Sequence, residues 1–171
     1  MNNREVDKLL TLIRGGDNDA FAELYVKTKR GVYSFLYTYY RKPEDTEDAM
    51  QTVYLKVKRN IESYRPGTNG RAWLLEIAKN IALNDLKKNK ELELLTDEAD
   101  ETVSEAEGIT DLVKNILDEQ SAHIVILHAM WGYKHREIAS MMGLPTGTVL
   151  SKYKRAVDKL KTEMRKGGIL V

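Results

Sequence analysis

Residues Glu137–Ala156 read EIASMMGLPTGTVLSKYKRA and contain two short helical patterns joined by a Gly-Leu-Pro turn. Gly143 can adopt the left-handed backbone conformation that ends a helix, and Pro145 fixes the backbone beside the start of the next helix. Two helices joined by so tight a turn form a helix-turn-helix, whose second helix can enter the major groove of DNA. An ordinary helical hairpin with solvated lysines is the alternative interpretation.

Length and composition favour a water-soluble protein. The chain has 171 residues, which allows one domain or two small ones. It has no cysteine, which excludes disulfides and thiolate metal sites. The first ten residues are too charged for a signal peptide, and no apolar run approaches the roughly 20 residues that span a bilayer. We therefore expect a cytoplasmic protein with no membrane insertion of its own.

Charge is segregated along the chain, although the net charge is only +1. Residues 1–90 contain 17 basic and 12 acidic residues, and residues 114–171 contain ten basic and five acidic ones. Residues 91–113 contain nine acidic residues and no basic one, a composition typical of an extended, solvated segment. The sequence therefore predicts domains at 1–90 and 112–171, joined by an acidic flexible linker at 91–111.

Apolar spacing predicts helices throughout and no strand, so the predicted fold class is all-α with two small helical domains. A first helix ends at Gly15-Gly16, a second stops before Pro43, and a third begins near Pro43 and runs to about Ile61. We expect the remaining helices at Arg71 to about Lys88, around Leu112–Leu117, around Glu119–Trp131 with Asp118 as its cap, and in the helix-turn-helix.

The fourth helix and the loop before it combine basic and aromatic residues. Such a combination suits a nucleic-acid strand, because cations contact phosphates and rings stack on exposed bases. The apolar spacing around Trp73 favours a core position for that side chain. Tyr64 and the loop Arg65–Gly70 are candidates for contact with a flipped base, since Pro66 and Gly67 shape a loop with accessible backbone.

The stretch Asp45–Lys88 resembles region two of the extracytoplasmic-function (ECF) sigma factors of bacterial RNA polymerase. The resemblance lies in Trp73-Leu74, in Ile77-Ala78-Lys79-Asn80 and in Asp85. The stretch from about Leu117 to Lys161 resembles region four, through its Glu-Ile-Ala, Gly-Leu-Pro, Gly-Thr-Val and Ser-Lys motifs. The two matches stand in the family's order and are separated by a linker.

The resemblance implies a promoter-recognition subunit that binds core RNA polymerase and promoter DNA, double-stranded at the minus-thirty-five element and single-stranded at the minus-ten element. It also implies an anti-sigma factor as a partner, and a place for the acidic linker in the RNA exit path. By position, the polymerase-docking residues are Asp45, Asp48 and Gln51. The predicted minus-ten contacts are Tyr64, Arg65, Thr68, Asn69, Lys79, Asn80 and Lys87. The predicted minus-thirty-five contacts are Thr146, Gly147, Thr148, Leu150, Ser151, Lys152, Lys154 and Arg155.

Several positions depart from the family pattern. Glu76 stands where many members carry Arg, which weakens a phosphate contact at that place. Leu150 stands where the family often has a basic residue; it can touch a thymine methyl group but cannot donate a hydrogen bond. Lys152 and Tyr153 replace an Arg followed by an apolar residue. Promoter preference therefore cannot be transferred from relatives.

The sequence gives little support to the hypothesis that the protein is an enzyme. His123, His128 and His135 form no HExxH motif, and no phosphate-binding glycine loop is present. We expect no metal, no cofactor and no catalytic residues. Two alternatives stay open: a one-component regulator, with an effector pocket or dimer interface in residues 1–90, and a divergent sigma-like protein that binds polymerase or DNA without directing initiation.

Overall fold

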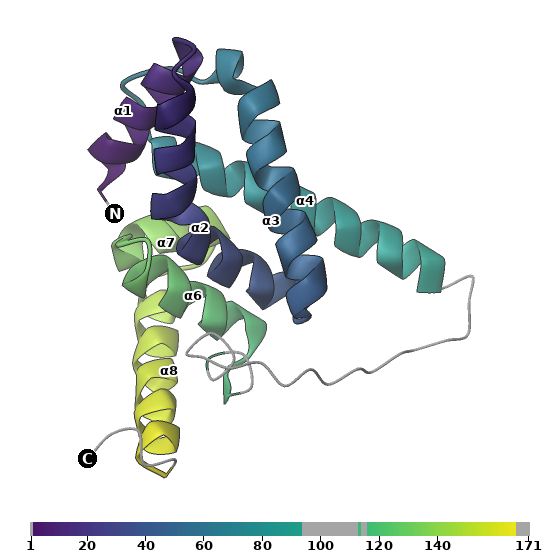
Figure 1. The fold of residues 1–171 in the computed structure, drawn as a ribbon. Helices are drawn as coiled ribbons and strands as arrows, with labels where there is room; N and C mark the ends of the chain where they lie inside the picture. Colours follow the sequence, from purple (N-terminus) through teal and green to yellow (C-terminus); the bar gives the residue numbers. More distant parts are fainter. Residues whose placement is uncertain (1, 94–112, 114–115, 167–171) are drawn as a thin grey trace. The chain divides into compact units, whose positions relative to one another are not determined.

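The computed structural model describes residues 2–93, 113 and 116–166 (Figure 1). All regular secondary structure in these ranges is helical, which confirms the predicted all-α class. The chain divides into two compact units, Met1–Glu105 and Ala106–Val171. The first contains α1 (Asn3–Arg14), α2 (Asn18–Tyr40), α3 (Pro43–Arg59), the 3₁₀ turn η1 (Ile61–Ser63) and α4 (Gly70–Glu93); the second contains α6 (Glu119–Ala129), α7 (His135–Met142) and α8 (Thr146–Lys166).

Local caps set the helix boundaries of the first unit. The Asp17 carboxylate accepts a hydrogen bond from the Ala20 amide at 3.0 Å, which satisfies a free donor at the start of α2. α2 ends at Arg41, whose φ of 58° is left-handed, and Pro43 then occupies the first turn of α3. The signals that predicted these boundaries are therefore the interactions that form them.

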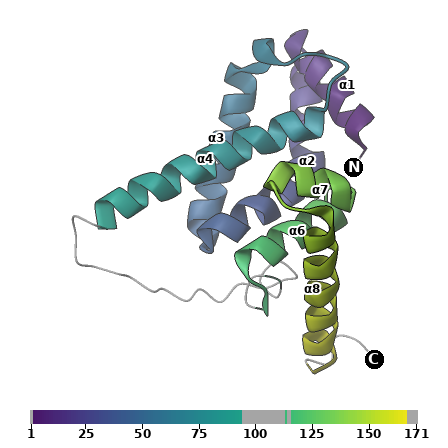
Figure 2. The same cartoon turned by 180° about the vertical axis from the view of Figure 1, so that it is seen from behind.

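The core of the first unit lies where α4 crosses the helices before it. α4 packs against α1, α2 and α3, and Figure 2 shows it running across α2 and α3. Leu10, Leu24, Val53 and Leu74 come from these four helices and are completely buried. Two side chains predicted to be buried in α4 are only half-buried, Trp73 and Ile77.

The second unit is built around the helix-turn-helix. Gly143 ends α7 in the left-handed conformation, with φ of 64°, and the Leu144 amide donates to the Ala139 carbonyl at 2.9 Å. The Pro145 carbonyl accepts the first hydrogen bonds of α8, from Thr148 and Val149. These contacts produce the tight turn that the Gly-Leu-Pro sequence predicts.

Of the predicted helix around Leu112–Leu117, the structure describes residues 113, 116 and 117, and the acidic linker beyond Glu93 lies outside the described residues. Val113 and Ile116 have helical backbone, and α4 continues to Glu93, beyond its predicted end near Lys88. The predicted domain boundaries therefore stay a prediction. None of the described helices has a stretch long and apolar enough to cross a membrane.

Candidate nucleic-acid interface

α8 exposes most of the residues that were predicted to contact double-stranded DNA. Val149 and Ala156 lie on the opposite side of the helix and are 0% and 3% exposed. Because α8 packs against both α6 and α7, these buried residues fix which side of it faces outward. Of the predicted contacts, Thr148 and Lys152 are half-buried, and the exposed ones are Thr146, Gly147, Leu150, Ser151, Lys154 and Arg155. Their contact with DNA stays a prediction.

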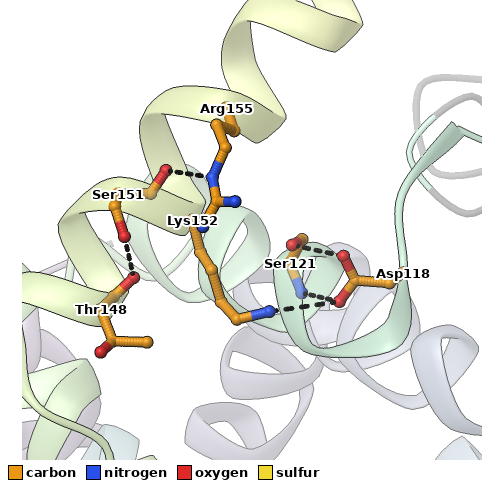
Figure 3. A network of polar contacts seen from close by, with 6 residues as sticks. All are labelled: Asp118, Ser121, Thr148, Ser151, Lys152 and Arg155. Carbon is orange, nitrogen blue, oxygen red and sulfur yellow. Dashed lines mark hydrogen bonds and ion pairs between the residues drawn. The ribbon is translucent and has the colours of Figure 1, made fainter.

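The outward face of α8 is partly ordered by contacts within the helix (Figure 3). The Ser151 hydroxyl donates to the Thr148 carbonyl at 3.0 Å, and Arg155 Nε donates to the Ser151 carbonyl at 3.2 Å. Within the described part of the chain, the terminal amino groups of Arg155 make no hydrogen bond or ion pair. Arg155 can therefore present those groups as a paired donor to a guanine edge.

Lys152 has a partner in its own unit, which the sequence did not indicate. Its Nζ lies 3.9 Å from Asp118 Oδ1, and the side chain is 26% exposed (Figure 3). Asp118 also caps α6, accepting from the Ser121 amide at 3.0 Å and from the Ser121 hydroxyl at 2.7 Å. Burial raises the pKa of Asp118, but Ser121 and Lys152 outweigh it, so the pKa lies below its ordinary value. A phosphate contact by Lys152 would compete with this ion pair.

A small hollow beside this pair concentrates positive charge. It has a volume of about 160 Å³ and is lined by three cations, Lys152, Arg155 and Lys159, with Asp118 as the one carboxylate among its lining residues. Lys159 Nζ donates to the Ile116 carbonyl at 2.5 Å. The side of α8 next to its reading face is therefore basic as well, which suits a polyanion.

Beneath α8 lies a cluster of three rings that sequence reasoning did not find. The rings of His128 and His135 stack with centroids 4.3 Å apart, and Tyr153 meets them edge-on at 4.8 and 4.7 Å. His128 Nδ1 lies 2.8 Å from the Tyr133 carbonyl oxygen. Burial, followed by the charge of His128, lowers the pKa of His135. Tyr153 thus packs α8 against the end of α6 and the start of α7.

The loop before α4 differs from its prediction at Tyr64. This side chain was expected to offer a stacking face, but it is only 1% exposed. Its ring packs against Trp73, with centroids 5.2 Å apart, and its hydroxyl donates to Asp7 at 2.5 Å. Tyr64 cannot stack on a base in this arrangement, since its ring is already covered. Trp73, predicted as a core residue, is the half-buried aromatic ring at this place.

The other predicted loop residues are exposed, yet two of them shape the loop itself. The Thr68 hydroxyl donates to the Arg65 carbonyl at 2.6 Å. Asn69 Oδ1 accepts from the Ala72 amide at 3.1 Å and so caps α4. Arg65 is exposed, and its guanidinium makes no hydrogen bond or ion pair with another described residue. Arg65 is therefore the loop cation best placed to contact a phosphate.

α4 continues the predicted minus-ten surface away from the loop. Trp73, Asn80 and Lys87 are seven residues apart, a spacing that puts them on one stripe of the helix. Asn80 and Lys87 are exposed, and Lys79 is half-buried. The structure thus places a partly accessible ring, an amide and a cation along one line, and their contact with DNA stays a prediction.

The predicted docking residues Asp45, Asp48 and Gln51 are all exposed on α3. The two carboxylates border an open hollow of about 230 Å³, which Asp85 of α4 also lines. The Tyr40 hydroxyl donates to Asp85 Oδ2 at 2.6 Å, and burial, followed by this hydrogen bond, raises the pKa of Tyr40. Its lining residues include three carboxylates and one cation, Lys88, so the surface is acidic on balance and suits a basic partner.

Among the described residues, no three His, Asp or Glu side chains are grouped so that they could hold a metal ion. His128 Nδ1 lies 2.8 Å from the Tyr133 carbonyl oxygen, and His135 Nε2 is buried with no hydrogen-bond partner among the described residues.

Comparison with known families gives one match in each unit. A family model described as Sigma-70 region 2 matches residues 24–91. A second, described as Sigma-70, region 4, matches residues 112–160 and so includes α6, α7 and most of α8. The two matches follow the order that the sequence motifs indicated.

Curated relatives span most of the chain. The RNA polymerase sigma factor CarQ of Myxococcus xanthus is 29% identical over 159 residues, which cover 86% of this chain and 91% of the relative. The ECF RNA polymerase sigma factor SigM of Mycobacterium tuberculosis is 31% identical over 160 residues, covering 90% of this chain and 81% of the relative.

Two solved structures share the fold. CnrH, solved in complex with the cytosolic domain of CnrY, has a TM-score of 0.63 at 20% identity and covers 95% of this chain and 98% of its own. The sigma factor RpoE of Bartonella quintana, solved with the anti-sigma factor NepR, has a TM-score of 0.69 at 21% identity and covers 87% and 98%.

Proposed function

The chain belongs to the ECF group of the sigma-70 family, and from this premise we propose that it directs core RNA polymerase to promoters and opens the DNA there. The observation that carries the proposal is the pairing of each family match with its own compact unit: region two with the helices up to α4, and region four with the helix-turn-helix. The proposed place of action is the cytoplasm, with the polymerase as partner.

In the proposed division of labour, each unit has its own DNA target. The outward face of α8 enters the major groove of the minus-thirty-five element, where Arg155 and Lys154 contact bases and phosphates. The loop Tyr64–Asn69 and the stripe of α4 hold the separated minus-ten strand. Opening a duplex costs a few kcal/mol per unstacked base, and binding of the open strand offsets that cost. The chain itself performs no bond chemistry; the polymerase does.

The acidic hollow on α3 is the proposed docking surface for the core enzyme. Its carboxylates, Asp45 and Asp48, are exposed and unneutralised by any described ion pair. By likeness to relatives solved with such partners, an anti-sigma factor is also proposed to bind the chain. The one-component alternative would need an effector pocket or a dimer interface in residues 1–90; the open hollow beside α3, at about 230 Å³, is itself smaller than the roughly 300–1,000 Å³ usual for ligand sites.

The test is reconstitution of the purified chain with bacterial core polymerase. We expect the chain to comigrate with the core and to support transcript initiation from a promoter library. Asp48→Lys should abolish comigration, because it reverses a charge at the hollow, whereas Glu47→Lys, on the same helix but away from the hollow, should not. Comigration without initiation would favour the divergent sigma-like alternative, and DNA binding without comigration would favour a regulator.

A further inference from the structure

α1 reaches the loop that is proposed to hold the minus-ten strand, although α1 lies outside the residues that match region two. One carboxylate oxygen, Asp7 Oδ1, accepts two hydrogen bonds from this loop. The Tyr64 hydroxyl donates to it at 2.5 Å and the Gly67 amide at 2.8 Å. The two donors belong to residues three positions apart in the loop, so one half-buried side chain holds both of them.

Two further residues of α1 hold the ends of the same loop. Asn3 Oδ1 accepts from the Arg71 amide at 3.2 Å, and Asn3 Nδ2 donates to the Thr68 carbonyl at 3.4 Å. Arg14 donates to the Tyr64 carbonyl at 3.3 Å. Asn3, Asp7 and Arg14 are four and seven residues apart along α1, which places them on one face of the helix. That face therefore contacts the loop at Tyr64, Gly67 and Thr68 and the first turn of α4 at Arg71.

The approach of α1 to the loop is close enough to require glycine. A Cβ atom on Gly70 would lie 3.0 Å from the Asp7 amide nitrogen and 3.1 Å from the Tyr64 hydroxyl. Gly67 has φ of 79°, a conformation that residues with side chains rarely adopt. The loop thus takes an unusual shape whose amide and hydroxyl donors point at one acceptor.

The chemistry of the Tyr64 hydroxyl supports a lasting hydrogen bond. Burial, followed by the hydrogen bond to Asp7, raises the pKa of Tyr64 to about 12. The phenol therefore stays protonated and donates throughout the pH range in which proteins fold. A donor held to a carboxylate in a partly buried site makes a stronger hydrogen bond than a neutral pair does.

We propose that Asp7 is a positioning residue for minus-ten recognition: it holds the loop Tyr64–Asn69 in the shape that presents Arg65 and the backbone carbonyl groups of Pro66 and Gly67 to the DNA strand. Asp7 itself touches no base. The inference rests on the proposed function, and it extends the site to a helix that neither the family match nor the sequence motifs include. It predicts that base discrimination at the minus-ten element depends on a carboxylate 57 residues before Tyr64.

The variants are Asp7→Ala, Asp7→Asn and Tyr64→Phe, with Asp19→Ala as the control. Asp19 is an exposed aspartate that makes no described hydrogen bond or ion pair with the loop, and its removal changes the net charge equally. Each variant is reconstituted with core polymerase and titrated with fluorescent single-stranded minus-ten oligonucleotides, the preferred sequence beside single-base changes. All titrations run well below the melting midpoint of the variant.

We expect Asp7→Ala to lower the ratio of affinities for preferred and changed sequences about tenfold, since two hydrogen bonds are lost. Asp7→Asn, which keeps an acceptor oxygen, should restore part of the ratio, and Tyr64→Phe should lower it less than Asp7→Ala because Gly67 still donates. Core binding and minus-thirty-five binding should equal those of the control. Hydrogen exchange of the free chain should be fastest across residues 64–70 in Asp7→Ala and unchanged there in the control Asp19→Ala.

An unchanged ratio in a folded Asp7→Ala holoenzyme would overturn the inference. If Asp7→Ala does not fold, Asp7→Asn and Tyr64→Phe decide: wild-type ratios in both would overturn it as well. Failure of the proposed function looks different, because the unaltered chain would then bind no core polymerase or show no minus-ten preference, and this inference would fall with it.

Discussion

The loop Tyr64–Asn69 and the helix α8 are both proposed to contact promoter DNA, but they are held in place differently. α8 is a regular helix that α6 and α7 position through buried apolar side chains such as Ile138 and Val149. The loop has no repeating structure and is held by hydrogen bonds to α1, by the hydrogen bond from Thr68 to the Arg65 carbonyl and by the packing of Tyr64 on Trp73. Apolar packing thus fixes the position of a regular helix, which is proposed to bind duplex DNA. Hydrogen bonds fix the conformation of an irregular loop, which is proposed to bind a separated strand.

Removal of an apolar side chain under α8 should give the largest effect on stability. Ile138→Ala should lower the free energy of unfolding of the second unit by about 2–5 kcal/mol, because the side chain is fully buried. Met141→Ala on the same helix should cost far less, since Met141 is 37% exposed. Urea titration checks this, with Trp131 fluorescence for the second unit and Trp73 for the first. If Ile138→Ala lowered the midpoints of both unfolding transitions equally, the two units would not unfold independently, which would contradict the account.

A pair of glycines sharpens the comparison between loop and helix. Gly70→Ala should destabilise the first unit by about 1–3 kcal/mol, because the added methyl group meets the backbone of Asp7 and the side chains of Tyr64 and Val6. Gly147→Ala should leave the second unit unchanged or up to about 1 kcal/mol more stable, since nothing lies within 4 Å of its Cβ position in a helix. Equal losses at both positions, measured by urea titration, would show that the close approach of α1 is unimportant.

Two cations of α8 should differ in their effect on minus-thirty-five binding. Arg155→Ala should weaken binding by about 1–3 kcal/mol and relax sequence preference, because its terminal amino groups are free to contact a base. Lys152→Ala should weaken the binding of all DNA sequences alike, by about 1 kcal/mol or less, because Lys152 also forms an ion pair with Asp118. Fluorescence anisotropy over a range of salt concentrations checks both. Intact binding of the preferred sequence by Arg155→Ala would show that the reading face is assigned wrongly.

The smallest expected effect is a pH dependence confined to the second unit. The pKa of His135 is lowered in the folded state, so below its ordinary value of about 6.5 the unfolded chain binds more protons than the folded one. The free energy of unfolding should therefore fall as the pH decreases from 7 through 6.5 to the lowered pKa, and then level off. Urea midpoints from Trp131 fluorescence should show this slope, and His135→Gln should remove it. A slope of the same size in Trp73 fluorescence would refute the assignment.

The features that were predicted correctly from the sequence are formed by residues that lie close together in the chain. The cap at Asp118, the left-handed Gly143 and the start of α3 at Pro43 each involve residues at most five positions apart. Apolar spacing likewise identified the helices, because one face of each must be buried. Such features need no knowledge of the tertiary structure.

What the sequence did not predict depends on residues that are distant along the chain. Tyr64 looked accessible because its partner, Asp7, stands 57 positions earlier. Lys152 was predicted only as a DNA contact because its partner, Asp118, stands 34 positions before it. Tyr153 was noted only as a departure from the family pattern, whereas it packs beneath α8 on two histidines. Each of these side chains can either face outward or contact a residue that is distant in the sequence, and only the tertiary structure decides which of the two occurs.

The central claim, that one unit opens the minus-ten element while the other binds the minus-thirty-five element, is tested most directly by permanganate reactivity of promoter thymines. The measurement compares Asn80→Ala and Arg155→Ala holoenzymes with the unaltered one, beside assays of core binding and closed-complex formation. The account predicts that the Asn80→Ala holoenzyme forms closed complexes but leaves the minus-ten thymines unreactive. The Arg155→Ala holoenzyme should instead be defective in forming the closed complex itself. Thymine reactivity that is unaltered by Asn80→Ala, together with unaltered base preference after replacement of Arg65–Asn69, would contradict it.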